Sequence, residues 1–479
     1  MIILAALLPV SCDLFNPNKE TVRETLYEDS FYAQNMQTDE FYEIKASRLV
    51  DGEKCVIWAE AGSGVTKASA RKIAEKYDTI IRPRIVDAFS EKNFTADFNG
   101  SQQRFDDILD YANRYTGGKD GKLTILLLDI KDGYDSKKNN SYVAGYFFSG
   151  DFQRRGDIGY GFFSNGRDMI YIDTNPGLKM KPEQTYATFA HELQHLINYI
   201  TSVRINRKYL QDTWVDEGLS SHAEYLYLGK NPEDKCEWFS EDKNGTIAEG
   251  NNFFVWGNYM DGEESLSILD DYSTVYLFFR WLYLQADEEL KPRLFREIIS
   301  SDQFDYRAVT NVASQINPKW EDWETLLRTW FAANYAPSNT LYGYKGDSYL
   351  QSTIKVTPIA GDSIDLYPGE GVYSIINNPF PTKSASASIR YAGLARNGTI
   401  LGTDSPYTGN MLLTFNVNTN NKKSTPATTG QLTGVKPPAA AGVNGAARTV
   451  EAGGPYVIDA RDLLGREKAF PPTGLQPLR

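Results

Sequence analysis

YATFAHELQHLINYI at residues 186–200 and DTWVDEGLSSHAEYL at residues 212–226 are the two segments around which the chain is organised. All three histidines of the protein lie in them. His191 and His195 flank Glu192 in the pattern H-E-x-x-H. Four residues are just over one helical turn, so both imidazoles project from the same helix face. We therefore predict that His191 and His195 bind one metal ion and that Glu192 reaches a water molecule on it.

Such a site needs a third protein ligand, because catalytic zinc is held by three side chains and keeps a fourth position for water. Candidates lie in the second segment, where Glu217, Ser221 and Glu224 fall on one face of a predicted helix. His222 points about 140° away from Glu217 on that helix. We expect His222 at the surface or in a substrate cleft, and not on the metal.

The second segment resembles a motif of the gluzincin metallopeptidases, which pair HExxH with a glutamate on a following helix. In their zinc aminopeptidase branch this helix reads W-L-N-E-G-F-A-S-x-x-E-Y, and this chain reads WVDEGLSSHAEY from Trp214 to Tyr225. The resemblance implies that Glu217 is the third Zn²⁺ ligand and that Glu224 supports the site from behind. Thermolysin-like members carry an aspartate where this chain has Ser221. We expect Ser221 behind the ligands together with Glu224, while another group must orient the zinc histidines.

A longer region, about residues 41–283, resembles the hyicolysin-type family of secreted bacterial metallopeptidases. The stretches that carry this resemblance include CVIWAEAGSGVT, LTILLLDIKDGY, YVAGYF and MIYIDT. The resemblance implies an α+β, zincin-like fold and a zinc-dependent peptidase that acts on proteins or peptides.

The choice between endopeptidase and exopeptidase rests on a missing segment. The Gly-x-Met-Glu-Asn segment with which the aminopeptidases hold a substrate amino terminus is absent from the sequence. This favours an endopeptidase. An exopeptidase on the same scaffold, and a surface-binding lipoprotein with little catalytic role, remain as alternatives.

The expected mechanism assigns two further parts of the chain. Glu192 acts as general base, and in the gluzincins a tyrosine or histidine from a downstream helix stabilises the oxyanion. Tyr272 and Tyr276 lie in the expected region, and we favour Tyr272. The substrate is expected to add a strand to the edge of the upstream sheet, at DMIYIDT (168–174) or GYGFF (159–163).

Periodicity and composition divide the chain into six parts. These are a signal or lipobox segment at 1–12, a tether at 13–40, an α/β subdomain at 41–180, a helical zinc-binding subdomain at 181–338, a small β-rich C-terminal domain at 339–417, and a disordered tail at 418–479. Within the α/β subdomain we predict two strands around Asp51 and Gly52, a helix opened by Thr66, a helix at about 101–115, and a central strand at 122–130. A loop of about 40 residues is expected after the helix that carries Glu217.

The composition, the amino-terminal segment and the cysteines indicate which binding partners and which cellular location to expect. The 479 residues are 41 % hydrophobic with a net charge of −12, and no Lys/Arg run predicts a nucleic-acid partner. Residues 1–12, MIILAALLPVSC, resemble a bacterial lipobox. We therefore expect a monomer that is secreted or held at the bacterial cell envelope by a lipid anchor on Cys12. Cys55 and Cys236 form either one disulfide or two separate buried thiols.

Overall fold

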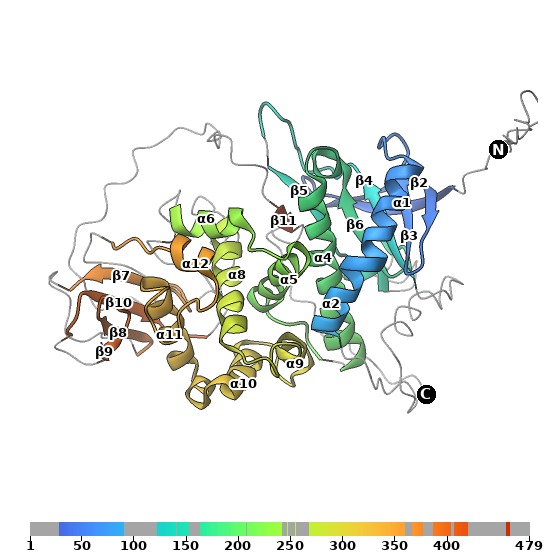
Figure 1. Ribbon diagram of the computed structural model, residues 1–479. Coiled ribbons are helices and arrows are strands. Elements are labelled where there is room, and N and C mark those ends of the chain that lie inside the picture. Colours follow the sequence, from blue (N-terminus) through green and yellow to red (C-terminus); the bar gives the residue numbers. More distant parts are fainter. Residues whose placement is uncertain are drawn as a thin grey trace, which may run out of the picture.

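The computed structural model describes residues 28–90, 122–139, 141–152, 163–206, 208–241, 268–359, 366–376, 387–403 and 407–419, the single residues 247 and 254, and the backbone of 457–459. The protein is α+β, with a large sheet at one end, a small sheet at the other and helices between them (Figure 1). The predicted helix at 101–115 and Cys12 lie outside the described residues.

The large sheet has the strand order β1-β2-β3-β4-β6-β5-β11. Its strands are β1 (Glu28–Asn35), β2 (Glu40–Asp51), β3 (Cys55–Glu60), β4 (Leu123–Leu128), β5 (Tyr142–Tyr146), β6 (Met169–Asp173) and β11 (Val457–Asp459). Strands β3, β4 and β6 run parallel, whereas β5 is antiparallel to β6. All six residues of β4 (LTILLL) are buried, as expected of a strand covered on both faces. The predicted central strand and the two strands around Asp51 and Gly52 are therefore confirmed.

Two predicted features of this sheet are wrong. The expected tether at 13–40 contains β1, which pairs with β2 from Glu28 to Asn35 and buries Phe31 and Ala33. The segment DMIYIDT is not an edge, because β6 lies between β4 and β5. Most of the other expected edge, GYGFF, lies outside the described residues.

Helices α1 (Lys67–Lys76), α2 (Arg82–Phe89) and α4 (Pro182–Tyr199) form a layer beside this sheet (Figure 1). Thr66 begins α1 with a capping box, in which its hydroxyl accepts from the Ser69 amide and Ser69 returns the bond, so the predicted helix start is confirmed. A π-helical stretch at Tyr77–Ile81 joins α1 to α2.

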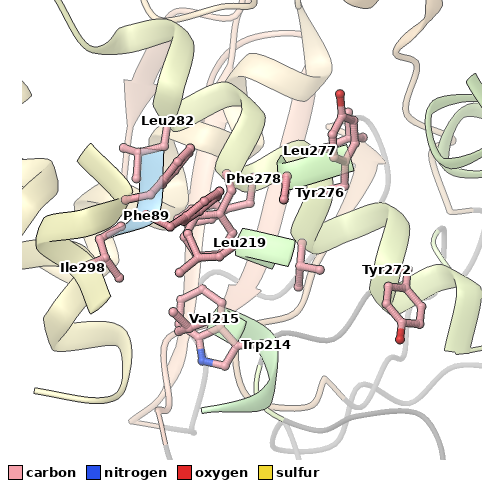
Figure 2. Packing of buried hydrophobic residues seen from close by; sticks show 14 of the residues in the cluster. Phe89, Trp214, Val215, Leu219, Tyr272, Tyr276, Leu277, Phe278, Leu282 and Ile298 are labelled. Atoms are coloured by element: carbon pink, nitrogen blue, oxygen red, sulfur yellow. The ribbon is translucent and has the colours of Figure 1, made fainter. Parts of the chain in front are cut away.

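The central helices are α5 (Thr213–Leu228), α6 (Glu233–Glu241), α8 (Ile268–Gln285), α9 (Leu294–Ser300), α10 (Tyr306–Ile316), α11 (Trp323–Tyr335) and α12 (Ser348–Thr353). They share one apolar core with the helical face of the large sheet, and aromatic side chains of α5 and α8 fill its middle (Figure 2). Gly218 on α5 allows α8 to approach closely, since a Cβ there would lie 2.1 Å from Phe279 Cδ2. Helix α6 corrects the prediction of a continuous loop after α5.

The small sheet has the order β7-β10-β8-β9, formed by β7 (Gly371–Ile375), β8 (Ile389–Leu394), β9 (Ile400–Gly402) and β10 (Met411–Asn416). It lies within the segment 339–417, for which a β-rich domain is predicted, although the first part of that segment folds as α12. The predicted disordered tail contains β11, which pairs in parallel with β5.

Cys55 and Cys236 are separate buried thiols, which excludes the disulfide alternative. Burial raises the pKa of both thiols. Within the described part of the chain, no helix combines the length and the apolar character that crossing a membrane requires.

Candidate metal centre

Helix α4 carries the H-E-x-x-H pattern through the interior of the protein. Pro182 occupies the first turn of α4, where its missing N–H costs no hydrogen bond, and Glu183 follows at the positive end of the helix dipole. Every residue from Thr185 to Asn198 is buried, because α4 packs on the sheet and on α5. The rings of His191 and His195 lie with centroids 4.7 Å apart. The prediction that the two imidazoles share one helix face is confirmed.

Helix α5 brings the third predicted ligand to these rings. Glu217 Oε2 lies 3.3 Å from His191 Nε2 and 3.5 Å from His195 Nε2. All three side chains are at most 1 % exposed, and their candidate ligand atoms lie within 4.8 Å of one another. Two imidazole nitrogens and one carboxylate oxygen that converge in this way match the donor set of a catalytic zinc site. The residues therefore fit a divalent metal ion of the type that the sequence predicts.

His191 is supported on its other ring nitrogen by Glu224, seven residues after Glu217 on α5. Glu224 Oε1 lies 2.8 Å from His191 Nδ1. Burial raises the pKa of Glu224, but Lys235 and His191 outweigh this effect and hold the pKa at about 2. Burial lowers the pKa of His191, whereas the hydrogen bonds to Glu217 and Glu224 raise it to about 9. Glu224 is thus an anion beside the Nδ1 atom of His191.

His195 is supported by Asp216, a residue that the sequence reasoning missed. Asp216 Oδ1 lies 3.1 Å from His195 Nδ1 and accepts a hydrogen bond from Asn198 Nδ2 at 2.5 Å. The oxygen of the Asn198 amide in turn accepts from the Ser202 hydroxyl at 3.0 Å. The only hint in the sequence is that Asp216 immediately precedes Glu217 in the motif.

Ser221 makes no hydrogen bond to either histidine, and His222 does not take the place expected for it. The Ser221 hydroxyl is fully buried and has no hydrogen-bond partner among the described residues, so the histidines are oriented by Glu224 and Asp216 instead. His222 is neither a surface nor a cleft residue. It is fully buried among the rings of Tyr225, Tyr283 and Phe295, with centroids 5.2, 4.8 and 4.6 Å away.

The two predicted reactive groups outside the ligand set lie on α4 and α8. Glu192 is fully buried on α4, next in sequence to His191. Tyr272 is 3 % exposed, and its ring centroid lies 6.4 Å from that of His191. Figure 2 shows Tyr272 at one end of the labelled group, with its hydroxyl directed away from the packed side chains. Tyr276, the alternative, donates its hydroxyl to Asn231 Oδ1 at 2.7 Å in a buried network, which favours Tyr272 at the metal centre.

One curated relative gives an independent comparison. The chain is similar to the neutral metalloprotease ShpI of Staphylococcus hyicus, with 27 % identity over 336 residues. The match covers 67 % of this chain and 66 % of the relative, so the chain spans just under two thirds of that protein's length. No family model matches the chain. The similarity supports a metallopeptidase relationship for the chain.

Proposed function

We propose that the protein is a zinc-dependent endopeptidase with a zincin-like fold. The observation that carries this proposal is the buried cluster of His191, His195 and Glu217, next to which Glu192 stands on the same helix. A relative whose name is that of a neutral metalloprotease supports the same class of activity. The proposal includes the three ligands, zinc as the metal and Glu192 as the general base.

In the proposed mechanism His191, His195 and Glu217 would hold a zinc ion. When bound, zinc polarises the scissile carbonyl and lowers the pKa of a water molecule to about 7. Glu192 takes the proton of the attacking water and passes it to the leaving amine nitrogen. The Tyr272 hydroxyl donates a hydrogen bond to the oxygen on which negative charge develops. Glu224 and Asp216 contact the Nδ1 atoms of the two histidines, which would leave both Nε2 atoms to hold the ion.

We place the substrate along β5. Gly145 on β5 approaches α4 so closely that a Cβ there would lie 2.8 Å from Thr188 Cγ2, and Thr188 precedes His191 by one helical turn. Further along, Phe147 contacts Tyr199 at the end of α4, with ring centroids 5.7 Å apart. The segment 145–147 therefore follows α4 past the metal ligands. Strand β11 pairs with the outer edge of β5 in the structure. An extended peptide would take the place of β11 on this edge and pair with the same main-chain groups, which is a common mode of peptide recognition.

The test is proteolysis of casein by the wild type, by Glu192→Gln and by a matched control, Glu183→Gln. Glu183 lies on the same helix but pairs with Lys76 at 2.8 Å on the surface. We expect Glu192→Gln to lose at least about 10²-fold in kcat, the usual contribution of a general base, while zinc content stays at one per chain. The control should retain its activity. Full activity of Glu192→Gln would overturn the mechanism.

The same assay separates the endopeptidase from the exopeptidase. An endopeptidase cleaves an internal bond of a peptide whose two ends are blocked, whereas an aminopeptidase requires the free amino terminus. We expect cleavage of the blocked peptide. Cleavage of unblocked peptides alone would assign the exopeptidase, and no cleavage of either by the zinc-loaded chain would favour a binding protein.

A further inference from the structure

Lys235 is a buried lysine that the mechanism has not used. It lies on α6, is 7 % exposed, and contacts both oxygens of Glu224, at 3.0 Å to Oε1 and 2.8 Å to Oε2. A lysine is seldom buried unless it is paired, since the desolvation of its ammonium costs several kcal/mol in practice. The contact to both oxygens is the arrangement that offsets this cost.

The pairing is connected to the metal centre through a single atom. Glu224 Oε1 lies between Lys235 Nζ at 3.0 Å and His191 Nδ1 at 2.8 Å. A carboxylate that faces an ammonium is an anion and can only accept hydrogen bonds. With Nε2 on a metal ion, His191 carries its proton on Nδ1 and donates it to Glu224.

The other histidine is supported by a different chemistry. Asp216, which faces His195, accepts from the neutral amide of Asn198 at 2.5 Å. The two buried carboxylates are therefore held differently, one by an ammonium from a third helix and the other by an amide of α4 itself. This difference indicates that the support of His191 by Glu224 depends on α6, a helix that contributes none of the predicted ligands.

We propose that Lys235 is a positioning residue of the metal centre, which fixes the anionic carboxylate of Glu224 and thereby the ring orientation and tautomer of His191. The inference rests on the proposed function, because it takes His191 as a metal ligand. Lys235 also lies 5.8 Å from the ring centroid of Tyr272, so the same ammonium borders the proposed oxyanion group. Lys235 itself touches no reacting atom and acts through Glu224.

The test measures zinc affinity by chelator competition for the wild type, Lys235→Met, Glu224→Gln and the double variant. Loss of a partner behind a metal ligand typically weakens binding 10- to 100-fold, so we expect a loss of about 10-fold for Lys235→Met. If Lys235 acts through Glu224, adding Lys235→Met to Glu224→Gln should bring no further loss. The visible absorption of the Co²⁺-loaded protein should change in Lys235→Met, because that signal reports the ligand geometry at His191.

The matched control is Arg280→Met, which breaks another buried ion pair. Arg280 Nη2 lies 2.8 Å from Asp347 Oδ2, and both side chains are at most 8 % exposed. This variant should lose stability while zinc affinity and the Co²⁺ spectrum stay as in the wild type. If Lys235→Met fails to fold alone, the double variant still decides, since it removes both charges together and must match Glu224→Gln in affinity.

The outcomes separate the two proposals. Equal loss of affinity from Lys235→Met in the wild-type and Glu224→Gln backgrounds would overturn the positioning role, and so would a variant that loses only stability. A wild type that binds zinc but cleaves no peptide would refute the peptidase proposal and leave the role of Lys235 standing. A wild type that binds no zinc would refute both.

Discussion

Replacement of His222 by leucine should make the protein more stable and less sensitive to acid. The His222 ring is fully buried, and neither of its nitrogens has a hydrogen-bond partner among the described residues. A buried polar group without a partner costs about 1–3 kcal/mol. We therefore expect His222→Leu to raise the free energy of unfolding at pH 7.5 by about 1 kcal/mol, after some loss of ring packing.

The free energy of unfolding should also depend on pH through the titration of His222. Burial, with a smaller contribution from the charge of Arg280, holds the pKa of His222 well below 6.5 in the folded protein. The unfolded chain titrates near 6.5, so below that pH it binds a proton that the folded chain does not, and stability falls as the pH falls. Between pH 7.5 and pH 5.0 this linkage removes about 2 kcal/mol, at about 1.4 kcal/mol per pH unit once the unfolded histidine is protonated.

The assay is urea unfolding of both proteins at pH 7.5 and pH 5.0, in chelator so that metal loss does not contribute. Contributions from other titrating groups cancel in the difference between the two proteins. The advantage of His222→Leu over the wild type should grow by about 2 kcal/mol at the lower pH. Ile298→Val, a fully buried apolar change on α9, should cost about 1 kcal/mol at both pH values. An equal effect of His222→Leu at the two pH values would refute the reasoning.

Two further predictions concern the contact of α5 with α8 and the sheet edge. Gly218→Ala should lower the free energy of unfolding, measured in urea, by about 1–3 kcal/mol, because the new Cβ would overlap Phe279. The control is Gly229→Ala, which should act through its left-handed backbone (φ 69°) alone and leave the contact of α5 with α8 unchanged. Deletion of residues 420–479 should lower KM for peptides, because β11 pairs with the β5 edge that the substrate is proposed to use. An unchanged KM would argue against β5 as the substrate edge.

The sequence predicts best what is local. The H-E-x-x-H spacing needs only a helix to place two imidazoles together, and α4 provides that helix. The uninterrupted apolar run of β4 likewise requires burial on both faces, whatever its neighbours are. Thr66 predicts the start of a helix because its capping hydroxyl and Ser69 lie within one turn. In each case the signal lies within one short segment of the sequence.

The features that the sequence does not predict depend on segments far apart in the chain. Strand β1 alternates only weakly and becomes a strand through its pairing with β2. His222 is buried by rings that α8 and α9 bring to it, and nothing in the motif on α5 specifies them. Lys235 lies in the polar stretch NPEDKCEWFSE, whose composition resembles a loop, yet its ammonium reaches the carboxylate of Glu224. Such contacts follow from how helices cross, which periodicity does not encode.

The metal centre contains several buried charged groups besides those of the H-E-x-x-H motif. Four buried carboxylates, those of Glu192, Asp216, Glu217 and Glu224, lie on α4 and α5 around two imidazoles. Buried anions are expensive unless cations or hydrogen bonds compensate them. Lys235 compensates one of the four through its pairing with Glu224. A divalent ion between His191, His195 and Glu217 would supply two further positive charges beside the Glu217 carboxylate. The buried Glu217 carboxylate therefore fits a dication on electrostatic grounds as well as by ligand geometry.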